Sequence, residues 1–224
     1  MNDPTAALPP PFAAAIFDLD GVLVDTAEYH YRAWKQIADE IGAAFDRRKN
    51  ERLRGVPRMR SLEIIVEDLP VRPANMEELA ARKNAAYVEM IQQVTPADLL
   101  PGARELLLAL RRGGIRIALG SSSKNARAVL ERLEIVPWFD AIVDGYGFAH
   151  AKPAPDIFLN AARELGIEPC RCVVIEDAAS GIAAAKSAGM FAVGIAREEP
   201  LPGADLIVHT PAEIPLSLWG LNNR

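Results

Sequence analysis

The sequence has few of the features that mark secreted or membrane proteins. Its 224 residues include only two cysteines, Cys170 and Cys172, which argues against a disulfide framework and fits a reducing cytoplasm. No second Cys or His pair lies near them, so a zinc site is not expected; if both lie on one strand they share a face, as free and unreactive thiols. No apolar run approaches the roughly 18 residues that span a bilayer. Residues 1–11 lack the basic start and apolar centre of a signal peptide, so we expect a cytoplasmic protein.

Positive charge is also scarce. The chain carries 25 Lys and Arg against 30 Asp and Glu, a formal net charge of -5 at pH 7. Proteins that bind nucleic acid or anionic membranes normally show a basic surface, so we expect neither partner. One local exception is the basic run between residues 46 and 60, which we interpret as a solvated helix face.

The order of apolar segments predicts an α/β fold in two parts. Residues 13–20 form a short apolar run ending in carboxylates, as in a buried parallel strand. Residues 28–95 show only helical patterns. After residue 96, strand-like runs alternate with helical segments, which is typical of parallel βαβ units. We predict a doubly wound parallel-sheet core from residues 12–27 and 96–224, an inserted α-helical cap at 28–95, and a disordered lead-in at 1–11.

Polar side chains follow the expected strands at their carboxyl ends, where doubly wound sheets bind ligands. We expect strands at 13–20, 115–122, 140–144, 172–177 and 191–195. They deliver Asp18, Asp20, Ser121, Ser122, Lys152, Glu176 and Asp177 to one edge of the sheet. Asp18 and Asp20 share a face of an extended strand. Several carboxylates together describe a site for a hard cation, for which Mg²⁺ is the natural occupant.

An anion partner is expected beside such a cation. The hydroxyl of Ser121, nearby backbone N–H groups and a helix beginning near Lys124 would seat a phosphate, and Lys152 would neutralise its charge. Each residue alone also has a structural interpretation: an Asp pair starts a turn, Ser121 caps a strand, and Lys152 lies on the surface. Their joint placement favours Mg²⁺-dependent phosphoryl transfer.

Four segments resemble the motifs of the haloacid dehalogenase superfamily, in order and at fitting spacings. They are FDLDGVLVDT at 17–26, ALGSSSKN at 118–125, KPAPD at 152–156 and VIEDAASGIAAAKSAG at 174–189. The resemblance covers about residues 12–200 and implies a Rossmann-like core with a helical cap inserted after the first motif.

The resemblance implies a role for each matched residue. Asp18 would attack phosphorus and become an aspartyl phosphate, and Asp20 would be the general acid and base. Asp18, the backbone carbonyl of Asp20 and Asp177 would bind Mg²⁺, with Glu176 as a further ligand or a supporting group. Ser121 and Lys152 would hold the phosphoryl oxygens.

A finer resemblance, to the β-phosphoglucomutase branch of the superfamily, lies in the cap. It is carried by DTAEYHYRAWK at 25–35, LRGVPR at 53–58, ARKNAAYVEMI at 81–91 and SSKN at 122–125. The resemblance implies that Arg58 binds the far phosphate of the substrate. The implied substrate-binding set is Thr26, His30, Trp34, Gly55, Val56, Arg58, Lys83, Asn84, Ser121, Ser122, Ser123, Lys124, Asn125 and Lys152. Without the resemblance His30 is a structural histidine, and Trp34 and Tyr87 belong to the cap core.

The implied activity is interconversion of β-D-glucose 1-phosphate and D-glucose 6-phosphate through β-glucose 1,6-bisphosphate, by a monomer. The alternative is a Mg²⁺-dependent phosphatase of the same fold that acts on small sugar phosphates. A catalytically dead regulator is disfavoured, because Asp18 and Asp20 are both present. The sequence departs from the pattern at Gly120 and Ser122, where alanines are usual, and in the segment YGFAHAKPAPD before and across the third motif. These departures bear on the choice of sugar.

Overall fold

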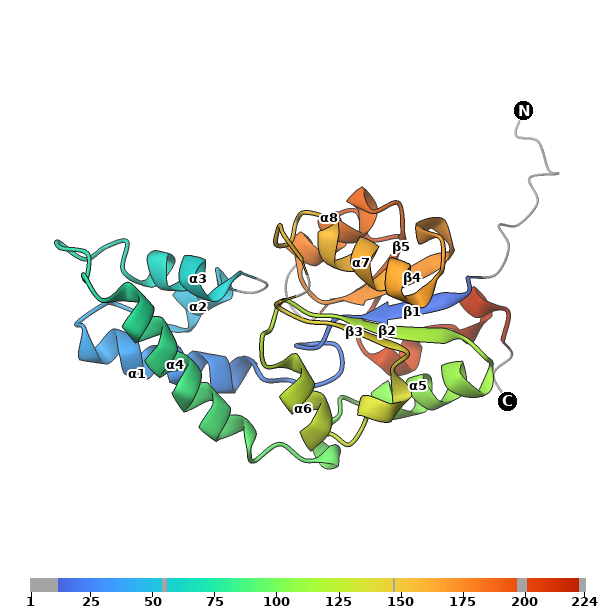
Figure 1. The fold of residues 1–224 in the computed structure, drawn as a ribbon, viewed down its shortest axis with the longest axis horizontal. Helices are drawn as coiled ribbons and strands as arrows, with labels where there is room; N and C mark the ends of the chain where they lie inside the picture. The colour runs from blue at the N-terminus through green and yellow to red at the C-terminus, as the bar shows by residue number, and fades with distance from the viewer. Residues whose placement is uncertain (1–11, 54–55, 147, 197–200, 222–224) are drawn as a thin grey trace.

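A six-stranded parallel sheet forms the centre of the molecule (Figure 1). The computed structural model describes residues 12–53, 56–146, 148–196 and 201–221. The strands are β1 (Ala14–Phe17), β2 (Arg116–Gly120), β3 (Ala141–Val143), β4 (Cys172–Glu176), β5 (Phe191–Ile195) and β6 (Leu206–Val208). Their order is β3-β2-β1-β4-β5-β6, with every neighbouring pair parallel. The sheet therefore confirms the predicted doubly wound α/β core.

Helices cover both faces of the sheet. Alternate residues of each strand point to opposite sides, and in β1 and β4 every residue is buried, so both faces need a cover. The helices are α5 (Ala103–Arg112), α6 (Ala126–Arg132), α7 (Asp156–Leu165) and α8 (Ala179–Ser187). In Figure 1, α7 and α8 lie above the sheet, with α5 and α6 below it. Ala15 and Phe17 of β1 belong to the apolar cluster with α5 and α6, whereas Ala14 and Ile16 belong to the cluster with α7 and α8.

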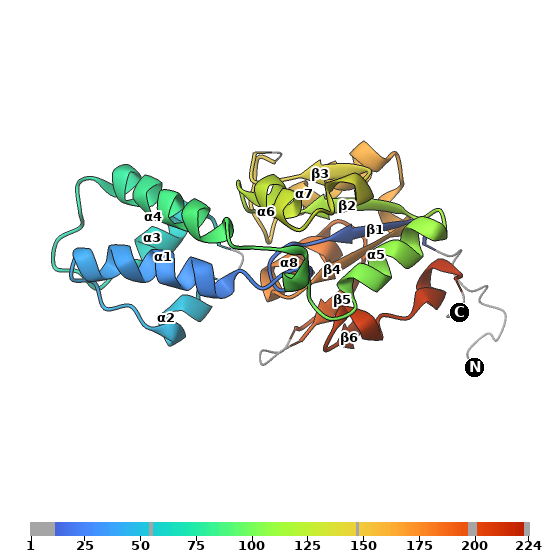
Figure 2. The ribbon, with the colours of Figure 1, turned by 90° about the horizontal axis from the view of Figure 1, so that it is seen from below.

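A group of helices lies beside the core, between β1 and β2 in the sequence (Figure 2). The group comprises α1 (Ala27–Glu40), α2 (Arg47–Glu51), α3 (Arg58–Ile65) and α4 (Met76–Ile91), and we call it the cap. It has an apolar cluster of its own, which includes Trp34, Ile37, Leu62 and Leu79. This arrangement agrees with an inserted cap; its limits at residues 28 and 95 remain a prediction.

The two connections between cap and core run side by side. Val24, on the outgoing connection, forms an antiparallel bridge with Leu99 on the returning one, and the backbone N–H of Leu100 donates to the carbonyl oxygen of Leu23 over 2.9 Å. Tyr87 and Ile91, near the end of α4, are buried in the core cluster that contains β1 and α5. The expectation that Tyr87 belongs to the cap core is therefore wrong, because the end of α4 packs against the core.

The remaining elements are short. The 3₁₀ helices are Pro96–Asp98, Val136–Trp138, Pro169–Arg171, Pro211–Glu213 and Leu216–Trp219. Cys170 lies exposed in one of them, while Cys172 is buried on β4. The expectation that both thiols share a strand face is therefore wrong, since Pro169 starts a helical turn ahead of the strand. Both cysteines are free, and burial raises the pKa of Cys172 to about 12, which makes it unreactive as expected.

Two predictions fall outside the described residues: the substrate contact of Gly55 and the disordered lead-in at 1–11. Within the described ranges, no helix combines the length and the apolar character of a membrane span.

Candidate active site

Asp18 lies buried directly after β1, the strand between β2 and β4. Its backbone N–H donates to the carbonyl oxygen of Ile175 over 2.9 Å, which fixes the residue beside the end of β4. The ammonium group of Lys152 donates to Oδ1 of Asp18 over 2.6 Å and to Oε2 of Glu176 over 2.8 Å. Burial alone lowers the pKa of Lys152, but the charges of Asp18 and Glu176 outweigh it and raise that pKa. Lys152 is therefore a fixed cation between two carboxylates.

Three acidic side chains converge at this edge. Asp18, Glu176 and Asp177 each place a carboxylate oxygen within 4.8 Å of the others. Burial and the nearby charge of Asp18 raise the pKa of Glu176. Carboxylates held this close repel one another, and an all-oxygen set of donors suits a hard divalent cation. The residues present therefore fit the metal site that the sequence predicts.

The side chain of Asp20 does not join that cluster. Its Oδ1 accepts a hydrogen bond from the hydroxyl of Thr26. Burial and the charge of Asp18 raise the pKa of Asp20 to about 6, against the opposing effects of the Thr26 bond, Lys83 and Lys152. A carboxyl group with a pKa near neutrality can both give and take a proton. A metal contact through the backbone carbonyl of Asp20 remains a prediction.

Two glycines leave room for the acidic groups, and neither was singled out as a site residue from the sequence. A Cβ atom on Gly21, whose φ is +79°, would lie 1.9 Å from Oδ2 of Asp177. A Cβ atom on Gly181 of α8 would lie 2.1 Å from Oε2 of Glu176. Any side chain at either position would displace a predicted metal ligand. The signal was present in the first and fourth motifs, which contain these glycines.

The expected anion seat is a tight turn after β2. Oγ of Ser121 accepts from the backbone N–H of Ser123 over 3.2 Å, and Oγ of Ser123 accepts from the N–H of Asn125 over 3.2 Å. The helix expected near Lys124 begins only at Ala126. The turn itself, and not a helix end, therefore presents the hydroxyls and Lys124 at this edge.

The cap contributes polar groups that face the core. Nη2 of Arg58 donates to Oδ1 of Asn84 over 2.7 Å. The same oxygen accepts from Nδ2 of Asn125 over 2.8 Å, which is a direct bond between cap and core. Arg58 stands at the first position of α3, directly after Pro57, whose fixed φ suits the start of a helix.

Lys83 is a buried cation in the cap. Its Nζ lies 2.7 Å from Nδ1 of His30 and within about 5 Å of the ring centroids of Trp34 and Tyr87. Burial, and then the charge of Arg58, lower the pKa of Lys83 to about 7. Burial and the charges of Lys83 and Arg58 also hold the pKa of His30 well below its usual range.

A cavity of about 520 Å³ brings these groups together between cap and core. Of the predicted residues, Asp18, Asp20, His30, Trp34, Val56, Arg58, Lys83, Asn84, Ser121, Ser122, Ser123, Lys124, Asn125, Lys152, Glu176 and Asp177 line it. Thr26 is fully buried behind Asp20 and is not among the lining residues. The lining also includes Asn50, Met59, Glu77, Gly145 and Phe148, which the sequence did not single out. Nothing in their local patterns marks them, since they reach the cavity through the packing of cap on core.

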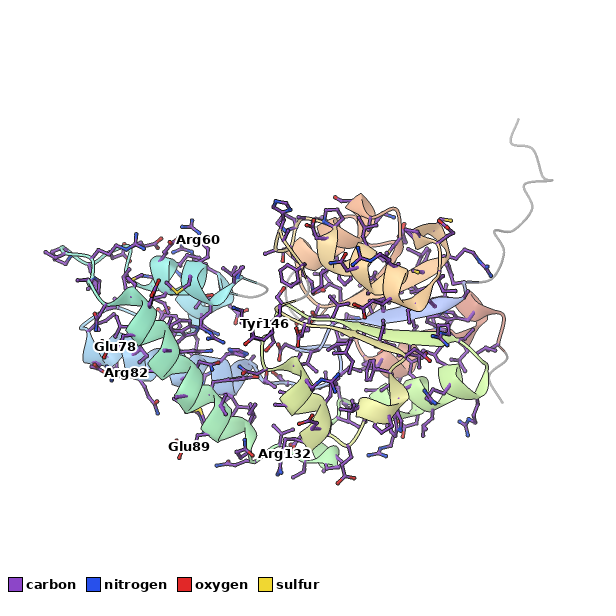
Figure 3. The ribbon with its side chains drawn as sticks, in the orientation of Figure 1. Arg60, Glu78, Arg82, Glu89, Arg132 and Tyr146 are labelled. Carbon is purple, nitrogen blue, oxygen red and sulfur yellow. The ribbon has the colours of Figure 1, made fainter. Side chains whose placement is uncertain are left out.

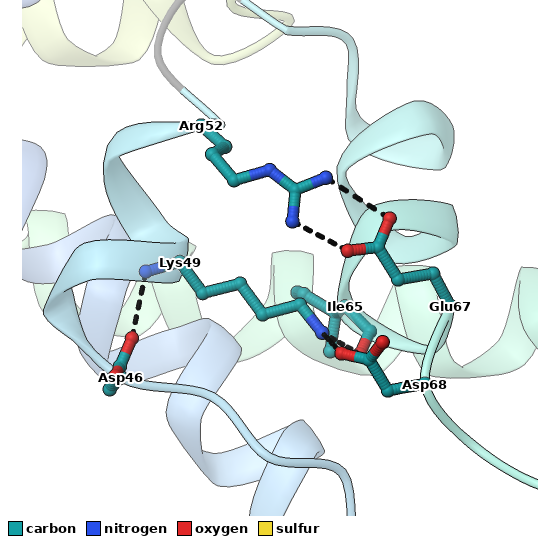
Figure 4. Close-up of polar contacts among 6 residues, drawn as sticks. All are labelled: Asp46, Lys49, Arg52, Ile65, Glu67 and Asp68. Atoms are coloured by element: carbon teal, nitrogen blue, oxygen red, sulfur yellow. Dashed lines mark hydrogen bonds and ion pairs between the residues drawn. The ribbon is translucent and has the colours of Figure 1, made fainter.

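The basic run at 46–60 is partly neutralised by acidic neighbours (Figure 4). Nζ of Lys49 lies 2.8 Å from Oδ2 of Asp68, and Arg52 pairs with Glu67 through both guanidinium nitrogens, at 2.5 and 3.1 Å. Arg47 pairs with Glu28 in the same way, at 2.9 and 3.4 Å. These pairs support the interpretation of the run as a solvated helix face.

Known proteins resemble this chain in both sequence and fold. The sequence profile of the haloacid dehalogenase-like hydrolases matches residues 12–189. The chain is 50% identical over 209 residues to β-phosphoglucomutase of Bacillus subtilis (strain 168), covering 92% of each protein. It is 36% identical to a fructose-1-phosphate phosphatase of Escherichia coli (strain K12), over 82% of this chain and 96% of that protein. The crystal structure of β-phosphoglucomutase from Clostridium difficile has a TM-score of 0.87 and 41% identity, covering 92% of this chain and 94% of the other.

Proposed function

Since the chain belongs to the haloacid dehalogenase-like hydrolase family, we propose that it is a β-phosphoglucomutase. It would interconvert β-D-glucose 1-phosphate and D-glucose 6-phosphate through β-glucose 1,6-bisphosphate. The observation that carries the proposal is one cavity with phosphoryl-transfer groups on the core wall and Arg58, Lys83 and His30 on the cap wall. The 50% identity to the Bacillus subtilis enzyme supports the same assignment.

Asp18 is the proposed nucleophile. Lys152 holds Oδ1 of Asp18 and so fixes the plane of the carboxylate. A carboxylate oxygen attacks phosphorus, the bond from phosphorus to the sugar oxygen breaks, and Asp20 gives its proton to that leaving oxygen. In the reverse direction Asp20 removes the proton from a sugar hydroxyl, which attacks the phosphorus of the aspartyl phosphate. Thr26 holds the carboxyl group of Asp20 for both steps.

Asp18, Glu176 and Asp177 would hold Mg²⁺, together with the predicted backbone carbonyl of Asp20. The ion, when bound, supplies positive charge that neutralises the phosphoryl group during transfer. Lys152, buried between Asp18 and Glu176, would add a second positive charge beside the phosphoryl group.

The cap distinguishes a mutase from a phosphatase. A phosphatase lets water take the phosphoryl group, whereas a mutase must exclude water and present a sugar hydroxyl. Arg58 offers a guanidinium fork that can grip the phosphate at the far end of the sugar, and Asn84 holds that guanidinium in place. The bond between Asn84 and Asn125 joins this anchor to the core turn.

A sugar-phosphate phosphatase is the second candidate, because the chain is also 36% identical to a fructose-1-phosphate phosphatase. The deciding experiment follows glucose 6-phosphate formation from β-glucose 1-phosphate with Mg²⁺ and a trace of the bisphosphate, alongside release of free phosphate. A mutase gives fast isomer formation with little free phosphate. Free phosphate without isomer would overturn the proposal in favour of the phosphatase. Asp18→Asn should abolish both reactions while the fold is retained, and activity in that variant would exclude the covalent route.

A further inference from the structure

A short turn after β3 packs against the turn after β2, which is the expected seat of the anion. The backbone N–H of Gly145 donates to the carbonyl oxygen of Ser123 over 3.1 Å. A Cβ atom on Gly145 would lie 2.7 Å from the carbonyl oxygen of Ser122 and 2.8 Å from the backbone nitrogen of Lys124. The two turns therefore touch through their backbones, and a side chain at position 145 would separate them.

Tyr146 follows Gly145 in this turn and therefore lies beside the cavity, although it is not itself among the lining residues. Its backbone N–H donates to Oδ1 of Asp144 over 3.1 Å, which shapes the turn. The ammonium group of Lys124 lies over the ring of Tyr146, 4.8 Å from its centroid. Figure 3 shows Tyr146 on the side of the core that faces the cap. Gly145, the preceding residue, and Lys124, which lies over the ring, both line the cavity.

Tyr146 is unusual for an aromatic residue in being 72% exposed, so core packing does not explain it. Among the described residues its hydroxyl makes no hydrogen bond. Arg58 of the cap is half buried; burial lowers its pKa, and the nearby Tyr146 acts against that shift. The phenol therefore has one cation, Lys124, stacked on its ring and a second cation, Arg58, in its neighbourhood.

We propose that Tyr146 is a specificity-determining residue that favours substrates carrying a second phosphate, at the end away from Asp18. Its ring fixes the ammonium group of Lys124 at the cavity, and its hydroxyl donates to the far phosphate that Arg58 grips from the cap. The inference rests on the proposed function, since only a substrate with two anionic ends needs this group.

The chemistry of the far phosphate fits these three groups. A phosphate monoester has several oxygens, and it can accept from a guanidinium, an ammonium and a phenol at the same time. An ammonium stacked on a phenol ring has already lost some of its freedom of rotation, so less conformational entropy is lost when the phosphate binds. A substrate or ion with a single phosphate, bound beside Asp18, gains little from Tyr146.

The test measures equilibrium binding by titration calorimetry in the Asp18→Asn background, which prevents turnover. The probes are β-glucose 1,6-bisphosphate and inorganic phosphate. Tyr146→Ala should weaken bisphosphate binding by about tenfold, the size of one hydrogen bond to a charged group, and phosphate binding by less than about twofold. Tyr146→Phe keeps the ring but lacks the same hydroxyl, so it should weaken bisphosphate binding nearly as much as Tyr146→Ala. Val71→Ala, which changes an exposed apolar side chain of the cap outside the cavity lining, serves as the control.

Bisphosphate affinity that is unchanged in Tyr146→Ala would overturn the inference and leave the mutase assignment standing. An equal loss for both probes would also overturn it, because that result describes general damage to the turn. A parent protein that binds bisphosphate no more tightly than phosphate would reject the inference and the proposed function together.

Discussion

The side-chain nitrogen of Lys83 lies 2.7 Å from Nδ1 of His30, so two groups that are ordinarily bases share one hydrogen bond. The pKa of each is lowered, that of Lys83 to about 7. His30 therefore accepts the hydrogen bond from Lys83, and Lys83 keeps its proton only up to about neutral pH. A buried cation of this kind opposes folding and is ready to meet an anion, because a bound phosphate would restore its charge.

Lys83→Met should make the unliganded protein more stable at pH 6.5 by about 1 kcal/mol or more, because a desolvated cation is removed. Between pH 7 and 10.5 the unfolded state binds the Lys83 proton and the folded state does not, so wild-type stability rises with pH relative to the variant. The advantage of Lys83→Met should therefore shrink from pH 6.5 to pH 9. Urea unfolding at both pH values measures it. A pH-independent difference would show that the Lys83 charge is not desolvated.

Thr26→Val should lower kcat by about tenfold, since the isosteric side chain loses the hydrogen bond that orients Asp20. Thr26→Ser keeps a hydroxyl and should recover most of the activity. Steady-state kinetics on β-glucose 1-phosphate separate the two variants, with thermal unfolding as the check on folding. Equal rates for the Val and Ser variants would mean that the bond does not position the acid.

Gly181→Ala should weaken Mg²⁺ binding by more than tenfold, because the new methyl group occupies the place of the Glu176 carboxylate. Activity should return in part at high Mg²⁺ concentration, which a simple loss of folded protein would not allow. Ser180→Ala is the matched control on the same helix, since the buried hydroxyl of Ser180 has no hydrogen-bond partner within the described structure. A metal titration of activity decides between binding and folding effects.

Removal of divalent cations with EDTA should abolish turnover, and Mg²⁺ should restore it. Mg²⁺ should also raise the melting temperature, because it relieves repulsion among Asp18, Glu176 and Asp177 and binds only the folded state. Asp177→Asn should diminish that rise. A melting temperature that is insensitive to Mg²⁺ in the wild-type protein would argue against a metal at this cluster.

Arg58→Ala should reduce mutase flux by about 100-fold and hydrolysis of a small aryl phosphate by only a few-fold, since the aryl phosphate has no second anionic end. Arg58→Lys keeps the charge without the fork that Asn84 holds, and should be intermediate. Comparing kcat/KM for the two substrates is the measurement. Equal losses on both substrates would remove Arg58 from the recognition of the far phosphate.

The core site could be predicted from sequence because its geometry is local to strand ends. Asp18, Ser121 and Glu176 each lie at or just after the end of a strand, and parallel strands bring those ends to one edge. The contact between Thr26 and Asp20 and the pair of Lys83 and His30 could not be derived from spacing. The first depends on the turns that the chain makes between Asp20 and Thr26, six residues apart, and the second on the packing of α4, which reaches His30 from 53 residues away in sequence.

Two elements, β6 and α2, have sequence patterns too weak for prediction. β6 is a three-residue strand at the sheet edge with an exposed central residue, Ile207, so its alternation is too short to detect. α2 has the sequence RRKNE and buries no side chain, so it has no apolar periodicity. Its visible sign is Asp46, whose carboxylate accepts from the backbone N–H of Lys49 over 2.7 Å, as an N-cap does.

The bridge between Val24 and Leu99 makes the cap an insertion whose two ends meet. A segment with adjacent ends can be exchanged for another without a change of register in any strand of the sheet. The residues that the cap contributes to the proposed site and the phosphoryl-transfer groups of the core are therefore encoded in segments of the gene that can change separately. A lineage can replace the cap while keeping Asp18 and its neighbours intact. A protein engineer can likewise graft a foreign cap between Val24 and Leu99.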